Sequence, residues 1–171
     1  MEQLLYIAIA ISAGTINALQ LAMIGGLTRQ RGGFESTFIS MLASVGGLAV
    51  ILGGMLLLGK NLSLPEVFRS PWSFLALAIV MSILLLAAAH GLPPYYLLTG
   101  LTAVPYLLAA AFVGPRLGLG VYFAAIISGQ MAGSLLFDHI GAFGAGTRPV
   151  DAARLAGVVL LVVGVVLIRG R

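Results

Sequence analysis

The sequence predicts an all-α integral membrane protein, a bundle of six transmembrane helices with five as the alternative. Of its 171 residues, 60% are hydrophobic and 8% are charged, whereas a soluble domain carries about 25% charged residues. Mean hydropathy is +1.12, and the apolar residues form long runs, not the short alternating segments of a barrel. Only helices and closed barrels satisfy every backbone group in hydrocarbon. We therefore expect a single transmembrane domain over residues 1–171.

Charge and cysteine content exclude several classes of protein. The net charge is +4, but the basic residues are scattered through the connections, whereas nucleic-acid binding needs them gathered on one face. Basic connections between apolar spans are the usual membrane pattern. The chain has no cysteine, which excludes disulfides, thiolate metal sites and thiol nucleophiles.

The first half of the chain holds three apolar runs near the twenty residues that cross a membrane: Gln3–Leu27, Phe34–Leu58 and Trp72–Ala89. We expect a turn at Thr28–Gly33 between the first two. Glu35 and Ser36 suit the first helical turn, where the helix dipole favours acidic and capping groups. Within the polar connection Gly59–Ser70, Pro65 predicts the start of a short interfacial helix, because proline is tolerated in a first turn.

The second half holds three more runs: Tyr95–Val113, Leu119–Phe137 and Asp151–Ile168. Pro105 predicts a kink in the first of them, because proline lacks an amide donor. Turns are expected at Gly114–Gly118 and at Asp138–Val150. Asp151 is suited to cap the last helix, and a basic tail, Arg169–Arg171, follows it.

The basic residues give almost no preference for one orientation. Six spans place five of them on one side and four on the other: Lys60, Arg69, Arg116, Arg169 and Arg171 against Arg29, Arg31, Arg148 and Arg154. A Lys and Arg excess normally fixes which side is cytoplasmic. Either another feature, such as one dominant helix, fixes the orientation, or the chain inserts both ways and pairs antiparallel with itself.

Catalytic motifs are missing from the sequence. The two histidines, His90 and His139, lie at the ends of different spans, and no carboxylate pair lies inside a span. The HExxH, GxSxG and GxxxxGK[ST] arrangements do not occur. We therefore expect that the chain is not an enzyme, with no metal site and no cofactor.

Polar side chains inside the apolar spans are the candidates for a substrate path. Gln130 lies in the middle of its span, and Asn17 and Gln20 share one helical face because they are three residues apart. A buried amide is costly without a hydrogen bond, so each faces either other helices or a wet cavity. Tyr106, beside Pro105, and Tyr122 complete the set. For every one of them, plain helix packing is the alternative.

Asp138 and His139 form the only adjacent pair of ionisable groups at the end of a span. A histidine can relay protons near neutral pH, but the pair also suits a helix-end anchor, with Asp138 capping backbone or pairing with Arg148. Glycines spaced by four or seven residues allow close helix approach, which predicts helix packing at four positions: Gly129, Gly133, Gly157 and Gly164.

Several of these segments resemble the small YdcZ-like inner-membrane family of the drug/metabolite transporter superfamily. The resemblance rests on the PRLG turn at Pro115–Gly118, the Ser-Gly-Gln core at Ser128–Gln130, the Asp138-His139 pair with its glycine turn, and the last span. It covers roughly residues 3–58 and 92–169. The apolar segment at about Leu64–Ala89 is an addition by comparison with five-span members.

The resemblance implies a half-transporter that works in the bacterial inner (plasma) membrane as a multi-pass protein. It implies secondary transport or export of a small organic substrate by two units in opposite orientation, either a homodimer or a pair with an oppositely oriented paralogous partner. The alternative is a non-transporting accessory or scaffold subunit whose amides only clamp helices. The expected partners are the lipid bilayer and a small-molecule substrate, with no nucleic acid.

Overall fold

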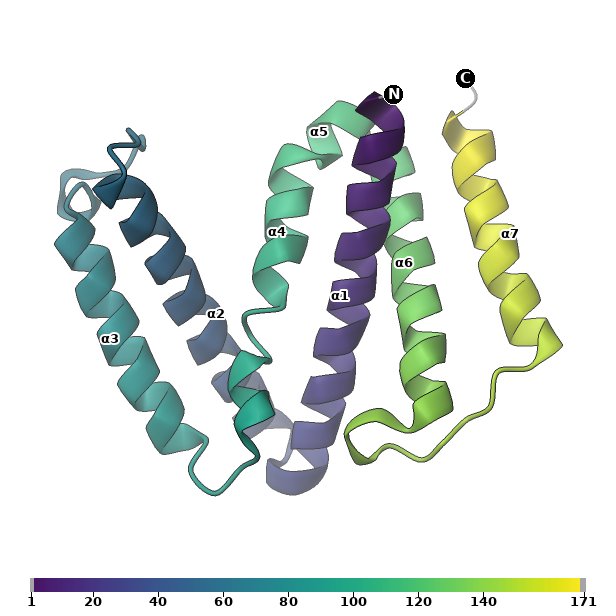
Figure 1. Ribbon diagram of the computed structural model, residues 1–171, viewed down its shortest axis with the longest axis horizontal. Coiled ribbons are helices and arrows are strands. Elements are labelled where there is room, and N and C mark those ends of the chain that lie inside the picture. Colours follow the sequence, from purple (N-terminus) through teal and green to yellow (C-terminus); the bar gives the residue numbers. More distant parts are fainter. Residues whose placement is uncertain (1, 170–171) are drawn as a thin grey trace. The chain divides into compact units, whose positions relative to one another are not determined.

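The structure is a computed structural model that describes residues 2–169; Gly170 and Arg171 of the expected basic tail lie outside the described residues. Within residues 2–169 the chain is helical and contains no strand (Figure 1). Short 3-10 turns, η1 (Glu66–Phe68), η2 (Pro94–Leu98) and η3 (Ala142–Gly144), join its α-helices. The α-helices are α1 (Glu2–Arg31), α2 (Gly33–Leu57), α3 (Pro71–Ala88), α4 (Ala103–Phe112), α5 (Gly114–Leu117), α6 (Leu119–Ile140) and α7 (Ala152–Arg169).

Five segments of the described chain are long and apolar enough to cross a membrane: Glu2–Arg31, Gly33–Leu57, Pro71–Ala88, Pro94–Phe112 and Leu119–Ile140. The sixth expected span forms as α7, which has 18 residues, as many as α3, and is apolar over Ala152–Leu167. The predicted class, an all-α membrane protein, is confirmed. Helix α7 is the sixth helix of the six-span interpretation, and five spans remain the alternative.

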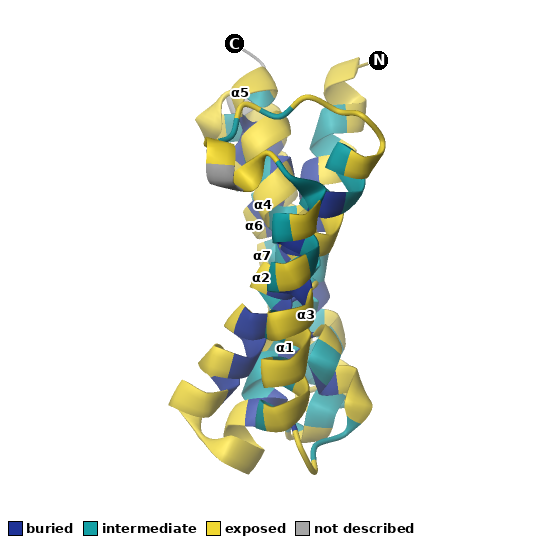
Figure 2. Ribbon diagram, turned by 90° about the vertical axis from the view of Figure 1, so that its left-hand side faces the viewer, coloured by how far each residue is buried: buried dark blue, intermediate teal, exposed yellow. Residues whose placement is uncertain are grey.

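Exposed apolar side chains cover the helices, as a bilayer requires. Only Phe74 and Ala78 of α3 are buried, whereas Ile79 and Ile83 are about 60% exposed. Figure 2 shows buried residues as short stretches between exposed turns. In water so much exposed apolar surface would be unfavourable, but hydrocarbon chains can cover it.

Some helix ends differ from those expected. Helix α1 continues through Arg31, so the expected turn at Thr28–Gly33 is wrong and Gly32, with φ +85°, alone separates α1 from α2. Helix α6 continues to Ile140, which places Asp138 in its last turn and not in the following loop. Gly141 ends α6 in the left-handed conformation with φ +61°, which glycine adopts without a Cβ penalty.

Contacts divide the chain into two compact units. The first contains the described parts of Met1–Gln30 and Pro105–Arg171, and the second contains Arg31–Val104. Each unit has its own packing and is described by itself. The single domain expected over residues 1–171 stays a prediction.

The second unit is built on the pairing of α2 with α3, which buries Ala49 against Phe74 and Ala78. Gly53 allows this approach, because a Cβ there would lie 3.3 Å from the Phe74 Cβ. At the other end of the unit, the Arg31 guanidinium donates a hydrogen bond to the His90 backbone carbonyl just beyond α3. The arginine therefore supplies a donor to a backbone carbonyl in the turn that follows α3.

The fourth span is broken, and the break lies earlier than the kink predicted at Pro105. The chain is non-helical between η2 and α4, at Thr99–Thr102. Proline offers no N–H to the carbonyl four residues before it, so the α-helix begins only at Ala103. The Thr99 hydroxyl donates to the Tyr96 carbonyl at 2.7 Å, and the Ser44 hydroxyl of α2 donates to the Gly100 carbonyl at 2.9 Å. Side-chain donors thus satisfy backbone acceptors at the break.

Candidate functional site

Helices α1 and α6 of the first unit cross at backbone contact. A Cβ built on Gly129 would collide with the backbone carbonyl of Ile11, and one on Gly14 would collide with that of Ile126. One turn further along, a Cβ on Gly133 would lie 2.9 Å from the Ala18 Cβ. The crossing therefore depends on small residues in both helices, as close helix pairs in membranes do.

A hydrogen bond reinforces this crossing. The Thr15 hydroxyl of α1 lies 3.2 Å from the carbonyls of both Ile11 and Gly129. The contact with Gly129 joins the two helices across their closest approach.

Beside the crossing the two helices enclose a groove of about 380 Å³, here called the α1–α6 groove. Its α1 side is apolar, and its α6 side carries an amide, a hydroxyl and a carboxylate. The lining residues are Ala18, Leu21, Ala22, Gln130, Met131, Ser134, Phe137 and Asp138. Gln130 is thus the path candidate that lines this groove.

The three polar groups of the α1–α6 groove lie in one row. Gln130, Ser134 and Asp138 are spaced by four residues, which places them on the same face of α6. The Ser134 hydroxyl donates to the Met131 carbonyl at 3.0 Å. In the described part of the chain, the Gln130 side chain makes no hydrogen bond, so its amide groups are open to the groove.

The tyrosine candidates lie in the core of the first unit. Tyr122 is 3% exposed in a cluster that contains Ala10 and Ile126, and Tyr106 packs against that cluster. The Tyr122 hydroxyl has no hydrogen-bond partner among the described residues. An orphaned buried hydroxyl is costly, which distinguishes Tyr122 from an ordinary core residue.

The amides of α1 lie apart from this arrangement. Asn17 and Gln20 are partly exposed, and neither lines the α1–α6 groove. Gln20 has an interaction partner within the chain. The structure therefore brings Gln130 together with polar groups of its own helix, not with the two amides of α1.

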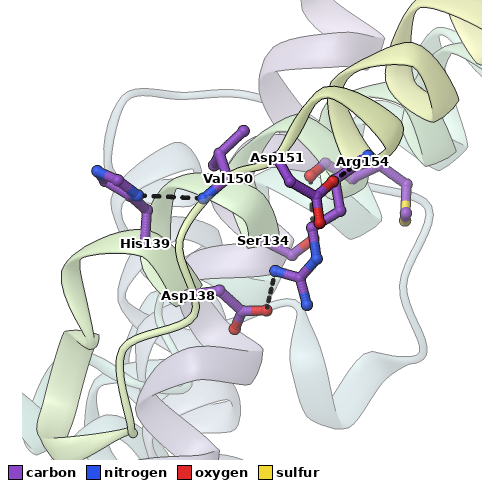
Figure 3. A network of polar contacts seen from close by, with 7 residues as sticks. Ser134, Asp138, His139, Val150, Asp151 and Arg154 are labelled. Atoms are coloured by element: carbon purple, nitrogen blue, oxygen red, sulfur yellow. Dashed lines mark hydrogen bonds and ion pairs between the residues drawn. The ribbon is translucent and has the colours of Figure 1, made fainter.

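Asp138 and His139 contact the connection to α7 and α7 itself (Figure 3). The Asp138 carboxylate lies 3.8 Å from the Arg154 guanidinium. The charged partner that we expected, Arg148, is therefore wrong. Arg148 contributes its backbone N–H, which donates to the Asp138 backbone carbonyl at 2.8 Å. The His139 Nδ1 accepts a hydrogen bond from the Val150 N–H at 3.3 Å. These contacts favour the anchor over the proton relay, and the roles of both residues remain predictions.

Helix α7 begins as the sequence predicts. The Asp151 carboxylate accepts a hydrogen bond from the Arg154 backbone N–H at 2.7 Å (Figure 3), which is the geometry of a helix N-cap. This cap confirms the expected start of α7. It also holds Arg154 in the first turn, opposite Asp138.

The glycines of α7 do not pack closely within the chain. Apart from adjacent residues and the backbone of α7 itself, no heavy atom of the described chain lies within 4 Å of a Cβ built on Gly157 or Gly164. Both line a second, apolar groove together with Ala124 and Ile127 of α6. The helix-packing role predicted for them stays a prediction.

Sequence reasoning missed three residues of this region: Thr15, Ser134 and Arg154. A signal for Ser134 was present, because the four-residue spacing from Gln130 through Ser134 to Asp138 is readable from the sequence. The pairing of Arg154 with Asp138 had no such signal, since a glycine-rich loop separates them. Among the described residues, no cluster of three potential metal ligands occurs.

The fold and the groove define a multi-pass membrane protein with a partly polar groove between two closely packed helices. Residues 73–167 match the sequence model of the family described as "Putative inner membrane exporter, YdcZ". Because the match covers more than half of the 171 residues, the chain belongs to this family. It is an inner-membrane protein of an exporter family, which points to transport and away from catalysis.

The range of the match corrects one expectation. It begins inside α3, so the segment that we interpreted as an addition to the family pattern, at about Leu64–Ala89, lies largely within that pattern. Residues 3–58, which also seemed similar, lie outside the matched range. Among curated proteins and among solved structures, no match to this chain was found.

Proposed function

We propose that the chain is a secondary transporter that exports a small organic molecule, and that the α1–α6 groove is part of the substrate path. The observation that carries this proposal is Gln130, a side-chain amide near the middle of α6 that lines the groove and makes no hydrogen bond in the described chain. An amide facing pure hydrocarbon would lose its hydrogen bonds with water. Water or substrate in the groove removes this cost.

The rest of the lining supports the same function. Ser134 and Asp138 extend the polar row from Gln130 toward the end of α6, opposite the apolar surface of Leu21. Binding sites for small molecules combine mostly apolar walls with a few convergent polar groups. Tyr122, with its unpartnered hydroxyl, lies two turns from Gln130 on the same helix and is the next candidate along the path, beside Tyr106.

The competing function is that of a scaffold or accessory subunit whose amides clamp helices together. A clamp requires that the amide bond to a neighbouring helix. Gln130 does not do so within the described residues, whereas Thr15 supplies the hydrogen bond that joins α1 to α6. The transporter is therefore the function that the geometry favours.

The proposal predicts that Gln130→Leu lowers transport while the fold survives. Purified protein in proteoliposomes would be tested for saturable flux of three matched aromatic compounds, one amine, one alcohol and one carboxylate. For the compound carried best, we expect the flux to fall by about tenfold, the equivalent of one lost hydrogen bond of about 1.4 kcal/mol. Gln20→Leu, at an amide outside the groove, is the matched control and should retain most of the flux.

Two results would argue against this assignment. Unchanged flux in a folded Gln130→Leu protein would remove Gln130 from the path. Absence of saturable flux for all three compounds, together with a large loss of thermal stability in Gln130→Leu, would favour the scaffold.

We also propose that two copies, or one copy and an oppositely oriented paralogue, form the working unit. The near balance of basic residues between the two sides supports insertion in both orientations. Many transporters are built from two halves of inverted topology, and an antiparallel pair of such chains would supply both halves.

The absence of cysteine makes the orientation directly measurable. Gly32→Cys, Ser63→Cys and Gly146→Cys place single thiols in connections of the described chain that are exposed. In intact cells, a membrane-impermeant thiol reagent should label part of each population, and the remainder should react only after the membrane is opened. Labelling of each site from one side only would exclude the self-inverted homodimer. The remaining arrangement would be a pair with a separately encoded, oppositely oriented partner.

A further inference from the structure

The polarity of the α1–α6 groove changes along its length. From Gln130 to Asp138 the row advances eight residues, or about 12 Å at the rise of an α-helix. It begins with an amide and ends with a carboxylate, the only ionisable group among the lining residues. The walls beside the row are apolar, with Leu21, Met131 and Phe137 among them.

The carboxylate at the end of the row is only weakly engaged. Its contact with Arg154 is 3.8 Å long, beyond the range of a hydrogen bond. The Arg154 nitrogen in this contact is buried and makes no hydrogen bond in the described chain. The Asp138 side chain is 44% exposed, so a second cation can reach it. Figure 3 shows the Asp138 carboxylate facing the Arg154 guanidinium of α7, with Ser134 of the row nearby.

We propose that the groove takes a small amphipathic molecule that carries a protonated amine, and that its ammonium group binds Asp138 in place of Arg154. This inference rests on the proposed function, because it names the substrate class of the same groove. The apolar part of the molecule lies against Met131 and Phe137, and Gln130 meets a polar group at the far end. A direct ammonium–carboxylate hydrogen bond is shorter and stronger than the long contact that it replaces.

Arg154 then acts as a resident competitor for Asp138. Its removal leaves the carboxylate without a cation, so Arg154→Gln should strengthen amine binding. If Asp138 and Arg154 formed only a structural link between α6 and α7, removal of either partner would have the same effect on ligand binding. The opposite signs expected for the two variants therefore separate a binding role from a structural role.

The test uses three probes of one shape: 3-phenylpropylamine, 3-phenylpropan-1-ol and 3-phenylpropanoate. Affinities would be measured by calorimetry on the full chain in nanodiscs of phosphatidylcholine and phosphatidylglycerol. We expect the amine to bind about tenfold or more tightly than the other two, as expected for a hydrogen bond between charged groups. Asp138→Asn should abolish this preference, Asp138→Glu should retain it, and Arg154→Gln should increase it.

Asp151→Asn is the matched control, because it removes a carboxylate from the same network. Asp151 caps α7 through the Arg154 N–H and does not line the groove. Asparagine also caps helices well, so this variant should keep the fold and the full amine preference. Loss of the preference in Asp151→Asn would assign it to the general negative charge of the region and overturn the site.

The ammonium can come from a free amine or from a lipid headgroup, and a second set of nanodiscs separates the two. Replacing part of the phosphatidylcholine by phosphatidylethanolamine should weaken probe binding to the wild type, and not to Asp138→Asn, if the headgroup occupies Asp138. Unchanged binding would identify the free amine as the ligand. Both outcomes place an ammonium at Asp138.

Equal affinities for the three probes, or an amine preference that survives in Asp138→Asn, would overturn the inference. So would a loss of the preference in Arg154→Gln equal to that in Asp138→Asn. These failures differ from that of the proposed function. Gln130-dependent flux without amine preference would support the transporter and contradict the proposed substrate class. Amine binding without flux would support the amine site and contradict the proposed transport function.

Discussion

Gly129→Ala should unfold the first unit or weaken it severely, the largest loss of stability expected from adding one methyl group to this chain. The new Cβ would collide with the backbone carbonyl of Ile11. A flexible side chain could move aside, but a helix backbone can yield only if α1 and α6 separate. Overpacking in a close-packed interior costs about 1–3 kcal/mol, and we expect the upper end of this range. Thermal unfolding of purified protein, followed by circular dichroism, would measure it.

Gly157→Ala is the control for this prediction. It adds the same methyl group to another helix of the same unit, where no described atom outside the backbone of α7 and the adjacent residues lies within 4 Å of the new Cβ. It should cost nothing, and the higher helix propensity of alanine could stabilise α7 by up to about 1 kcal/mol. Equal stability of the two variants would show that α1 and α6 do not cross at backbone contact. It would then also contradict the α1–α6 groove, which lies beside that crossing.

The sequence was sufficient to predict the class of fold and most helix positions. Long apolar runs identify membrane helices because the bilayer demands them, and the starts of α2, α3 and α7 lie within a residue of those expected. The helix ends were harder to place. Thr28 and Arg31 suggested a turn by their polarity, but α1 extends through them, since polar residues at the headgroup level do not oppose helix formation.

The arrangement of neighbouring helices could not be predicted, because the spacing of glycines does not say which helix they face. Gly129 and Gly157 both belong to glycine pairs that looked like packing seams. One of them allows backbone contact and the other borders an open groove. The break before α4 also lies ahead of Pro105, and within it the Gly100 carbonyl accepts a hydrogen bond from Ser44 of α2, a partner remote in sequence.

In the candidate site, too, individual residues could be predicted from the sequence, but contacts between helices could not. Gln130 was predicted from its own chemistry, as a lone amide in an apolar helix. The proximity of Arg154 to Asp138 could not be predicted, because the course of the loop between α6 and α7 determines it. Asp138, which we expected to pair with Arg148, instead contacts Arg154 and lines the α1–α6 groove.

As part of a substrate path, the α1–α6 groove would admit water to Gln130 near the middle of the membrane. In a chain without cysteine, Gln130→Cys and Ala132→Cys place single thiols two residues apart on α6, about 3 Å along the helix axis. Gln130 lines the groove, whereas Ala132 is exposed on the helix surface and does not line it. The two positions thus compare groove with lipid at nearly the same depth.

The deciding measurement is the rate at which a small water-soluble methanethiosulfonate reagent modifies each thiol in native membranes. Such reagents react with the thiolate, which forms in water and not in hydrocarbon. We expect Gln130→Cys to react about ten times faster than Ala132→Cys, or more, since only its thiol can ionise. Equally slow reaction at both positions would mean that the groove is closed to water, and it would contradict the proposed substrate path.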